Sequence, residues 1–166
     1  MFVAIVGARN RSSTEYAGAV LTDAMKQNIQ ATDRDLLVGY ITKLHERYRS
    51  SLGIMSFGCD DGIGHLAKEI CMKKEIKFAE IFWYFHGSAR WHKAETPKIH
   101  ISRNAAVLEI ADGFLVFPNE NRNSVVEDLI NRLSKLATVN DDDARPYAVI
   151  DVKGNVESAF KKEVLL

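Results

Sequence analysis

Residues 99–130 read IHISRNAAVLEIADGFLVFPNENRNSVVEDLI, and this stretch shows how the chain is organised. A segment of helical period leads into the apolar run Gly113–Phe117, and a polar segment separates that run from a second amphipathic helix. A wholly apolar strand between two helices is typical of a parallel sheet that is covered on both faces. The stretch therefore predicts an α/β fold.

The same pattern recurs along the chain. Apolar runs bounded by turn residues predict strands, and most of these runs are separated by segments of helical period. The five predicted strands are Phe2–Val6, Ile54–Phe57, Phe78–Phe85, Gly113–Phe117 and Tyr147–Val152. Two helical stretches, Thr14–Gln27 and Arg34–Arg49, are predicted between the first two strands. We therefore expect a three-layer, Rossmann-like, doubly wound parallel sheet of about five strands.

Composition and charge restrict the classes of protein that the chain can belong to. A chain of 166 residues, 46% of them hydrophobic, suits a single domain over residues 1–166. The 22 basic residues balance 22 acidic ones, so nucleic acid is not the favoured partner. No apolar run approaches the roughly 20 residues of a membrane helix. Cys59 and Cys71 form no CxxC pair and follow no apolar leader, so we expect a cytoplasmic protein.

The loops that follow the predicted strands are the candidate binding segments, because ligands of open α/β sheets bind outside the carboxyl ends of the strands. Gly7 ends the first strand and allows close approach of the backbone to a ligand. Arg9 and Arg11 follow it and are suited to contact a phosphate. An ordinary turn with exposed arginines is the alternative.

A second loop is rich in glycine. Residues 57–71 read FGCDDGIGHLAKEIC, which places Gly58 and Gly62 before a helix whose amide end can bind an anion. The loop has neither the GK[ST] of a Walker A loop nor the spacing of GxGxxG. Asp61 would repel a phosphate unless it caps the helix or contacts ribose hydroxyls, so nucleoside and phosphate recognition are equally plausible. Gly62 and Gly64 are expected to matter more for ligand binding than for stability.

Two helix starts place an arginine and a glutamate at one edge of the predicted sheet. Ser102 is a good N-cap, which predicts a helix that begins at Arg103. Ser124 is expected to cap the helix after the next strand and to place Glu127 one turn into it. The side chains of Arg103 and Glu127 are therefore expected to converge. The spacing of Ser124 and Glu127 is also that of a capping box, in which Glu127 only satisfies a backbone amide.

Metal and thiol chemistry are not favoured. The histidines show no HExxH or other tight ligand spacing, so no metal site is predicted. Cys59 lies beside the glycine-rich turn, but no candidate base accompanies it. A buried small hydrophobe is the simpler interpretation of this cysteine.

Three motifs together resemble the SLOG superfamily, which joins the DNA-processing (Smf) proteins to the Lonely Guy phosphoribohydrolases. VAIVGARNRSSTEYAG at residues 3–18 is similar to the first strand and loop of the DNA-processing branch. SFGCDDGIGHLAKE at residues 56–69 is similar to the glycine-rich second motif of the superfamily. HISRNAAVLEIADGFLVFP at residues 100–118 resembles the Lonely Guy stretch that contains the arginine and ends in proline.

The resemblance implies roles for particular residues. Arg103 and Glu127 correspond to the catalytic pair, with Ser124 in place of a threonine. The substrate-binding residues that we expect from the loops and the resemblance are Gly7, Arg9, Gly58, Asp61, Gly62, Asn104, Arg122, Asn123 and Ser124. The family's Gly-Gly-x-Gly is absent, because PNENRNSVVE at residues 118–127 carries side chains where tight phosphate-wrapping backbone is expected. Glu120 opposes a phosphate there, and Arg122 compensates for its charge.

Three functions agree with these features. The first is hydrolysis of the base–sugar bond of a nucleotide or nucleoside, which needs no cofactor because water is the acceptor. The second is a non-catalytic nucleotide sensor or single-strand DNA-binding module, with Arg90 and Trp91 among its contacts. The third is a scaffold that uses the fold alone. A homodimer is expected from the resemblance and from the aromatic residues Trp83, Tyr84, Phe85 and Trp91.

Overall fold

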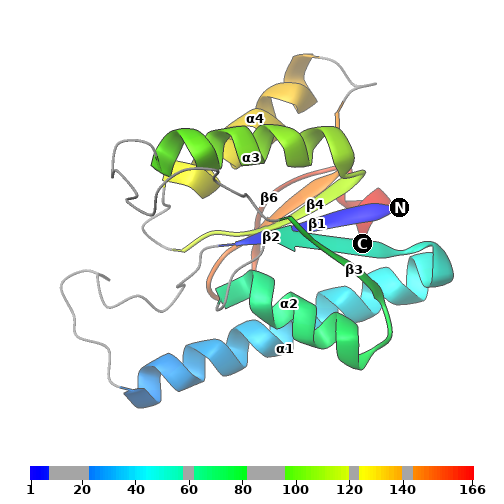
Figure 1. Ribbon diagram of the computed structural model, residues 1–166, viewed down its shortest axis with the longest axis vertical. Coiled ribbons are helices and arrows are strands. Elements are labelled where there is room, and N and C mark those ends of the chain that lie inside the picture. Colours follow the sequence, from blue (N-terminus) through cyan, green and yellow to red (C-terminus); the bar gives the residue numbers. More distant parts are fainter. Residues whose placement is uncertain (8–22, 58–61, 82–95, 120–123, 140–143) are drawn as a thin grey trace, which may run out of the picture.

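The computed structural model describes residues 1–7, 23–57, 62–81, 96–119, 124–139 and 144–166, shown in Figure 1. The side chains of residues 23–30, 96–102 and 124–125 lie outside this description. The strands are β1 (Phe2–Gly7), β2 (Gly53–Phe57), β3 (Lys77–Ile81), β4 (Gly113–Phe117), β5 (Tyr147–Ile150) and β6 (Val156–Phe160). The helices are α1 (Asp23–Tyr48), the short 3-10 helix η2 (Arg49–Ser51), α2 (Gly62–Lys73), α3 (Thr96–Ile110), α4 (Ser124–Val139) and α5 (Lys162–Leu165).

The strands form one mixed sheet in the order β3-β2-β1-β4-β5-β6. The pairs among the first five strands are parallel, whereas β6 is antiparallel to β5. The predicted α/β fold with a Rossmann-like three-layer arrangement is confirmed, but the prediction of about five parallel strands is wrong at this edge. A tight turn reverses the chain after β5, because the Asp151 carboxylate accepts hydrogen bonds from the backbone amides of Lys153 and Asn155.

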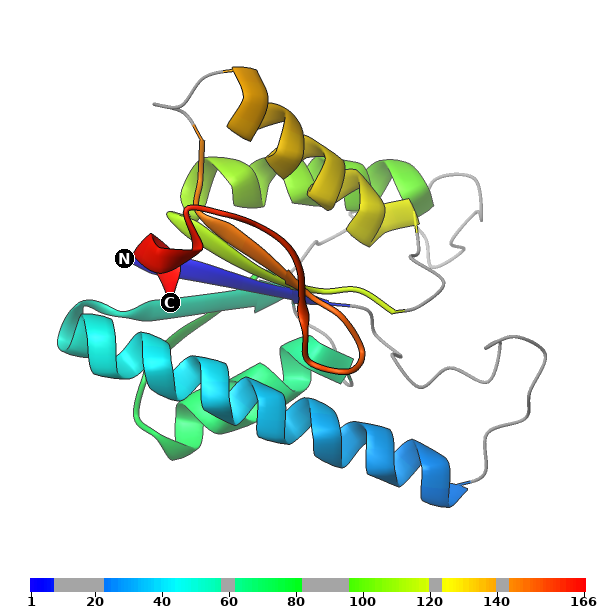
Figure 2. The same ribbon diagram turned by 180° about the vertical axis from the view of Figure 1, so that it is seen from behind.

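Helices cover both faces of the sheet. Figures 1 and 2 show α1 and α2 on one face and α3 and α4 on the other. Alternate residues of β1 contribute to the two cores, so that Ile5 belongs to the cluster with α1 and α2 and Ala4 to the cluster with α3 and α4. Both side-chain directions of a central strand are therefore buried, which is why its sequence is apolar throughout.

Two predicted helix boundaries were wrong. The chain does not break between residues 27 and 34, because α1 is one continuous helix; residues 28–33 include no glycine or proline that would end it. Helix α3 begins at Thr96 and not at Arg103. Pro97 lies in its first turn, where proline is well tolerated because the amide that it lacks has no partner there. The third strand ends at Ile81 within the described residues, so its predicted extension to residue 85 lies outside them.

Candidate functional site

The strand order reverses direction between β1 and β4, so the carboxyl ends of these two strands form the topological switch point of the sheet. Helix α2 begins at Gly62 and helix α4 begins at Ser124, each shortly after a strand that ends at this edge. Figure 1 shows the N-terminal ends of α3 and α4 on the same side of the molecule. Free amide groups at helix starts favour negative charge, and they are concentrated at this edge.

Arg103 occupies the middle of a helix and not its start, because it is the eighth residue of α3 and Ser102 lies inside the helix. Its guanidinium carbon Cζ lies 3.5 Å from the centroid of the Phe57 ring. Phe57 is the last residue of β2. Helical side chains lean toward the N-terminus of their helix, which explains how an arginine in the middle of α3 reaches the carboxyl end of a strand. The aromatic face attracts the guanidinium and restricts its movement.

Asn104 has a structural role that its sequence position did not reveal. Its side chain has no exposed surface, and its Nδ2 donates a hydrogen bond of 3.1 Å to Oδ2 of Asp128 on α4. The same carboxylate oxygen accepts a hydrogen bond of 2.8 Å from Nε of Arg132. Asn104 therefore joins α3 to α4, and its predicted contact with the substrate stays a prediction.

This link lies directly beside Arg103 and Glu127 in the chain. Glu127 lies in the first turn of α4 and is half-buried. Arg103 immediately precedes Asn104, and Glu127 immediately precedes Asp128, so the hydrogen bond joins the two helices one residue beyond each of these side chains. Eight residues of α3 precede Asn104 and four residues of α4 precede Asp128. Helix α3 therefore extends about one turn farther than α4 on the N-terminal side of this link.

The glycines at this edge have packing and backbone roles. A Cβ atom on Gly7 would lie 2.6 Å from the Cβ of Ile63, and a Cβ atom on Gly64 would lie 2.8 Å from the carbonyl oxygen of Phe57. Both glycines thus allow α2 to approach the ends of β1 and β2 closely. Gly62 has a φ of 75°, which a residue with a side chain rarely adopts. Gly64 thus has a packing role, and the expectation that it matters more for ligand binding than for stability stays a prediction.

Several predicted site residues fall outside the part of the chain that the structure describes. These residues are Arg9, Gly58, Asp61, Arg122 and Asn123, and Cys59, which was interpreted as a buried small hydrophobe, also falls outside it. The aromatic residues that suggested a dimer, at positions 83–85 and 91, fall outside it as well. Ser124 is the first residue of α4, which agrees with the predicted helix start, but its side chain is not described.

Two further features of the described residues concern thiol and metal chemistry. Burial raises the pKa of the Cys71 thiol to about 12, so this cysteine stays protonated at neutral pH and packs as an apolar side chain. The described parts of the chain include no group of three or more His, Cys, Asp or Glu side chains that is placed to hold a metal ion.

Comparisons with protein-family models, with curated proteins and with solved structures found no match. Membership of the SLOG superfamily therefore stays a prediction that rests on the three motifs. The fold itself defines the class, which is a Rossmann-like α/β domain whose switch point lies between β1 and β4. Within the described ranges, no helix is both long enough and apolar enough to cross a membrane.

Proposed function

We propose that the protein binds a nucleotide or nucleoside at the carboxyl edge of its sheet and hydrolyses the bond between base and sugar. The proposal depends most on the hydrogen bond between Asn104 and Asp128, because it joins α3 to α4 directly beside Arg103 and Glu127, the two residues that precede this pair. The topological switch point beside them is where ligands of doubly wound sheets bind.

Glu127 is the proposed catalytic carboxylate. Cleavage of an N-glycosidic bond develops positive oxocarbenium character on the sugar, and a carboxylate stabilises or captures that charge, as in glycosidases. Glu127 is half-buried, so its carboxylate is partly shielded from the solvent that would weaken this interaction. Water accepts the sugar, and the base leaves.

Arg103 is the proposed orienting residue. Its guanidinium lies over the Phe57 ring, with Cζ 3.5 Å from the ring centroid, and this contact restricts its movement. A restrained guanidinium binds a phosphate or a pair of sugar hydroxyls with a smaller loss of side-chain entropy. Arg103 therefore fixes the ligand relative to Glu127, which lowers the barrier by orientation and not by chemistry.

A non-catalytic nucleotide sensor is the second candidate. The sequence PNENRNS at residues 118–124 lacks the glycines of the related hydrolases, and a stacked arginine serves binding as well as catalysis. Both candidates use the same edge of the sheet. They differ only in whether the bound ligand is cleaved.

The test is a screen of nucleosides and nucleoside monophosphates for released base, run beside a thermal-shift panel. Glu127→Gln should keep the fold and most of the ligand affinity but lower turnover by orders of magnitude, because an amide lacks the charge that the oxocarbenium requires. Glu109→Gln is the matched control, because Glu109 is an exposed carboxylate near the far end of α3 and should leave turnover unchanged.

Three outcomes distinguish the candidates. Parent-like turnover by Glu127→Gln would contradict the catalytic role, because glutamine serves a capping box nearly as well as glutamate. Thermal stabilisation of the parent by a nucleotide without release of base would select the sensor. Neither stabilisation nor release across the panel would reject both candidates.

We further propose that the protein forms a homodimer, on the basis of the SLOG resemblance and the aromatic residues at positions 83–85 and 91. Light scattering at micromolar concentration measures the mass directly. A monomer mass would remove the dimer from the proposal and leave the site at the sheet edge unaffected.

A further inference from the structure

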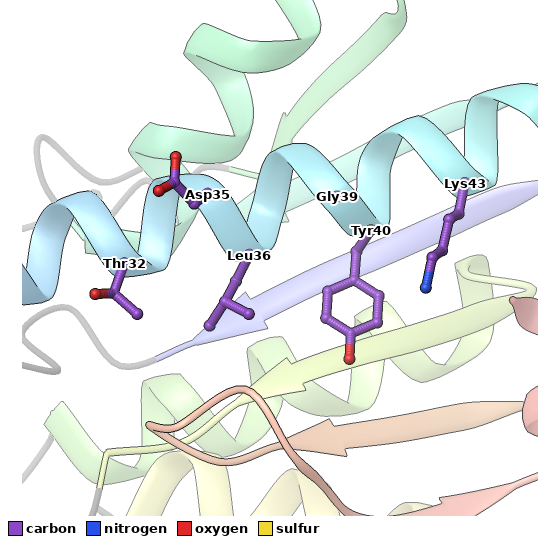
Figure 3. A pocket seen from close by; sticks show the side chains of 6 residues that line it. All are labelled: Thr32, Asp35, Leu36, Gly39, Tyr40 and Lys43. Atoms are coloured by element: carbon purple, nitrogen blue, oxygen red, sulfur yellow. The ribbon is translucent and has the colours of Figure 1, made fainter.

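A second candidate site lies on the opposite face of the sheet. A cavity of about 400 Å³ is lined by residues of α1, which are Thr32, Asp35, Leu36, Gly39, Tyr40 and Lys43. Figure 3 shows Thr32, Leu36, Tyr40 and Lys43 pointing from α1 toward the sheet and the β5–β6 turn. The volume falls within the range of small-molecule sites. Because α1 and α3 cover different faces, this cavity is separate from Arg103 and Glu127.

Gly39 is a glycine inside α1 that lines the cavity. A glycine inside a helix costs roughly 0.5–1 kcal/mol relative to alanine, so it usually has a packing or conformational reason. Here neither applies, because a Cβ atom on Gly39 would meet nothing within 4 Å and its φ is not positive. Gly39 is exposed and lines the cavity, so its missing side chain leaves the opening beside Tyr40 and Lys43 unobstructed.

The lining combines an aromatic ring with a cation. The Tyr40 ring is held by edge-to-face contact with Phe117, the last residue of β4, at a centroid distance of 6.1 Å. The Lys43 Nζ atom lies 5.7 Å from the centroid of the Tyr40 ring, so one small ligand can contact both. Burial, and then the charge of Asp151, raise the pKa of Tyr40, so its hydroxyl remains a hydrogen-bond donor at neutral pH.

The carboxylates near the cavity leave the end at Lys43 positive. Asp35 is eight residues before Lys43 on α1, which separates the two backbones by about 12 Å at a rise of about 1.5 Å per residue. The Asp151 carboxylate keeps its charge while it accepts hydrogen bonds from the backbone amides of Lys153 and Asn155, at 2.8 and 2.7 Å, and that charge disfavours an anion at the Tyr40 hydroxyl as well. A negative ligand group is therefore favoured at Lys43 and disfavoured toward Asp35.

We infer that this cavity binds a small molecule that carries a planar ring and an anionic group. The ring packs against Tyr40 and Leu36, the anion pairs with Lys43, and Gly39 leaves the space that the ring occupies. This site goes beyond the proposed hydrolase or sensor function and does not depend on it, because its lining residues all lie on α1 and include neither Arg103 nor Glu127.

The experiment compares three probes that share a ring and differ in charge: benzoate, benzamide and benzylamine. Titration of isotope-labelled protein, followed by backbone amide chemical shifts, should give saturable shifts around Gly39 and Tyr40 with benzoate, weaker shifts with benzamide and none with benzylamine. Lys43→Gln should weaken benzoate binding about two- to fivefold, as expected for a pair with an exposed lysine, and leave benzamide unchanged.

Gly39→Leu is the cavity-filling variant, and it should abolish the benzoate shifts while the melting temperature stays at or above that of the parent. Gly39→Ala is its control, since one methyl group leaves most of the cavity open and should preserve binding. The inference is overturned by benzoate shifts that persist in folded Gly39→Leu, by benzylamine that binds as well as benzoate, or by the absence of shifts along α1 with all three probes. If Gly39→Leu does not fold, the effect of Lys43→Gln on benzoate binding alone tests the inference.

Discussion

The two faces of the sheet hold their helices by different means. On one face, α2 lies close to the ends of β1 and β2 because Gly7 and Gly64 lack side chains, and α1 is joined to α2 by an ion pair of 2.7 Å between Arg34 and Glu69. On the other face, α3 is joined to α4 through the fully buried Asn104.

The shorter of these two links is not the one that contributes more to stability. The Arg34–Glu69 pair is shorter than the Asn104–Asp128 hydrogen bond, yet its side chains are 48% and 44% exposed. Water competes for exposed charges, so such a pair contributes about 1 kcal/mol or less. The Asn104–Asp128 bond is partly buried, since Asn104 has no exposed surface and the Asp128 side chain is 24% exposed, and loss of such a bond to a charged group costs about 1–3 kcal/mol. The helices of the proposed active site are thus held together by the stronger link.

The largest effect is expected from Gly64→Ala, which should lower the free energy of unfolding by about 2–3 kcal/mol through overpacking. The new methyl group would lie 2.8 Å from the Phe57 carbonyl oxygen, so α2 must move away from β2. Gly39→Ala is the matched control, because it adds the same atom to open space and should raise stability by about 0.5–1 kcal/mol. Urea unfolding measures both, and equal changes in the two variants would contradict the packing role of Gly64.

A smaller loss, about 1–2 kcal/mol, is expected from Asn104→Ala, because Asp128 loses a buried donor and keeps its bond from Arg132. If the link also sets the position of Glu127, this variant should lower kcat for base release more than it raises KM. Unfolding curves and steady-state kinetics on the same preparation test both parts. A stability loss no greater than that of Arg34→Ala would remove the difference between the two faces.

The smallest effect is expected from Arg34→Ala, under about 1 kcal/mol at neutral pH. The hydrogen bond from Arg34 holds the pKa of Glu69 below its ordinary value, so the pair stabilises the fold above the unfolded pKa of Glu69. This contribution is lost as the pH falls through the folded pKa. Urea unfolding at neutral pH and at about pH 3 should therefore show the variant and the parent converging in acid. A difference that persists in acid would mean that Arg34 acts by packing.

Some parts of the fold could be predicted from the sequence because a local pattern marks them. The apolar runs located β1, β2, β4 and β5, and a serine before a hydrophobic periodic stretch located the start of α4. Strand β6 was missed because it is a short, largely exposed edge strand without an apolar run. The start of α3 was misplaced because Ser102 resembles a cap, whereas Pro97 gave the better signal.

The candidate site also has residues that the sequence indicated and contacts that it did not. Arg103 and Glu127 were singled out from helix starts and from a family resemblance, and neither signal could show what surrounds them. From the sequence, Asn104 had only an expected role in substrate binding, and a pattern along one chain does not identify Asp128, which lies 24 residues away, as its partner. Nothing in the sequence distinguishes Phe57 from the other core phenylalanines, although it supports the Arg103 guanidinium.

The sequence by itself determined the α/β class and most of the strand positions, because these follow from the periodicity of apolar residues over a few turns or strands. Only the tertiary structure decided the strand order, the antiparallel β6, the hydrogen bond that joins α3 to α4 beside Arg103 and Glu127, and the packing role of Gly64 beside the open surroundings of Gly39. These features depend on contacts between segments that are distant in the chain. The sequence shows only that a residue is glycine, and not whether its missing side chain prevents a clash or leaves open space.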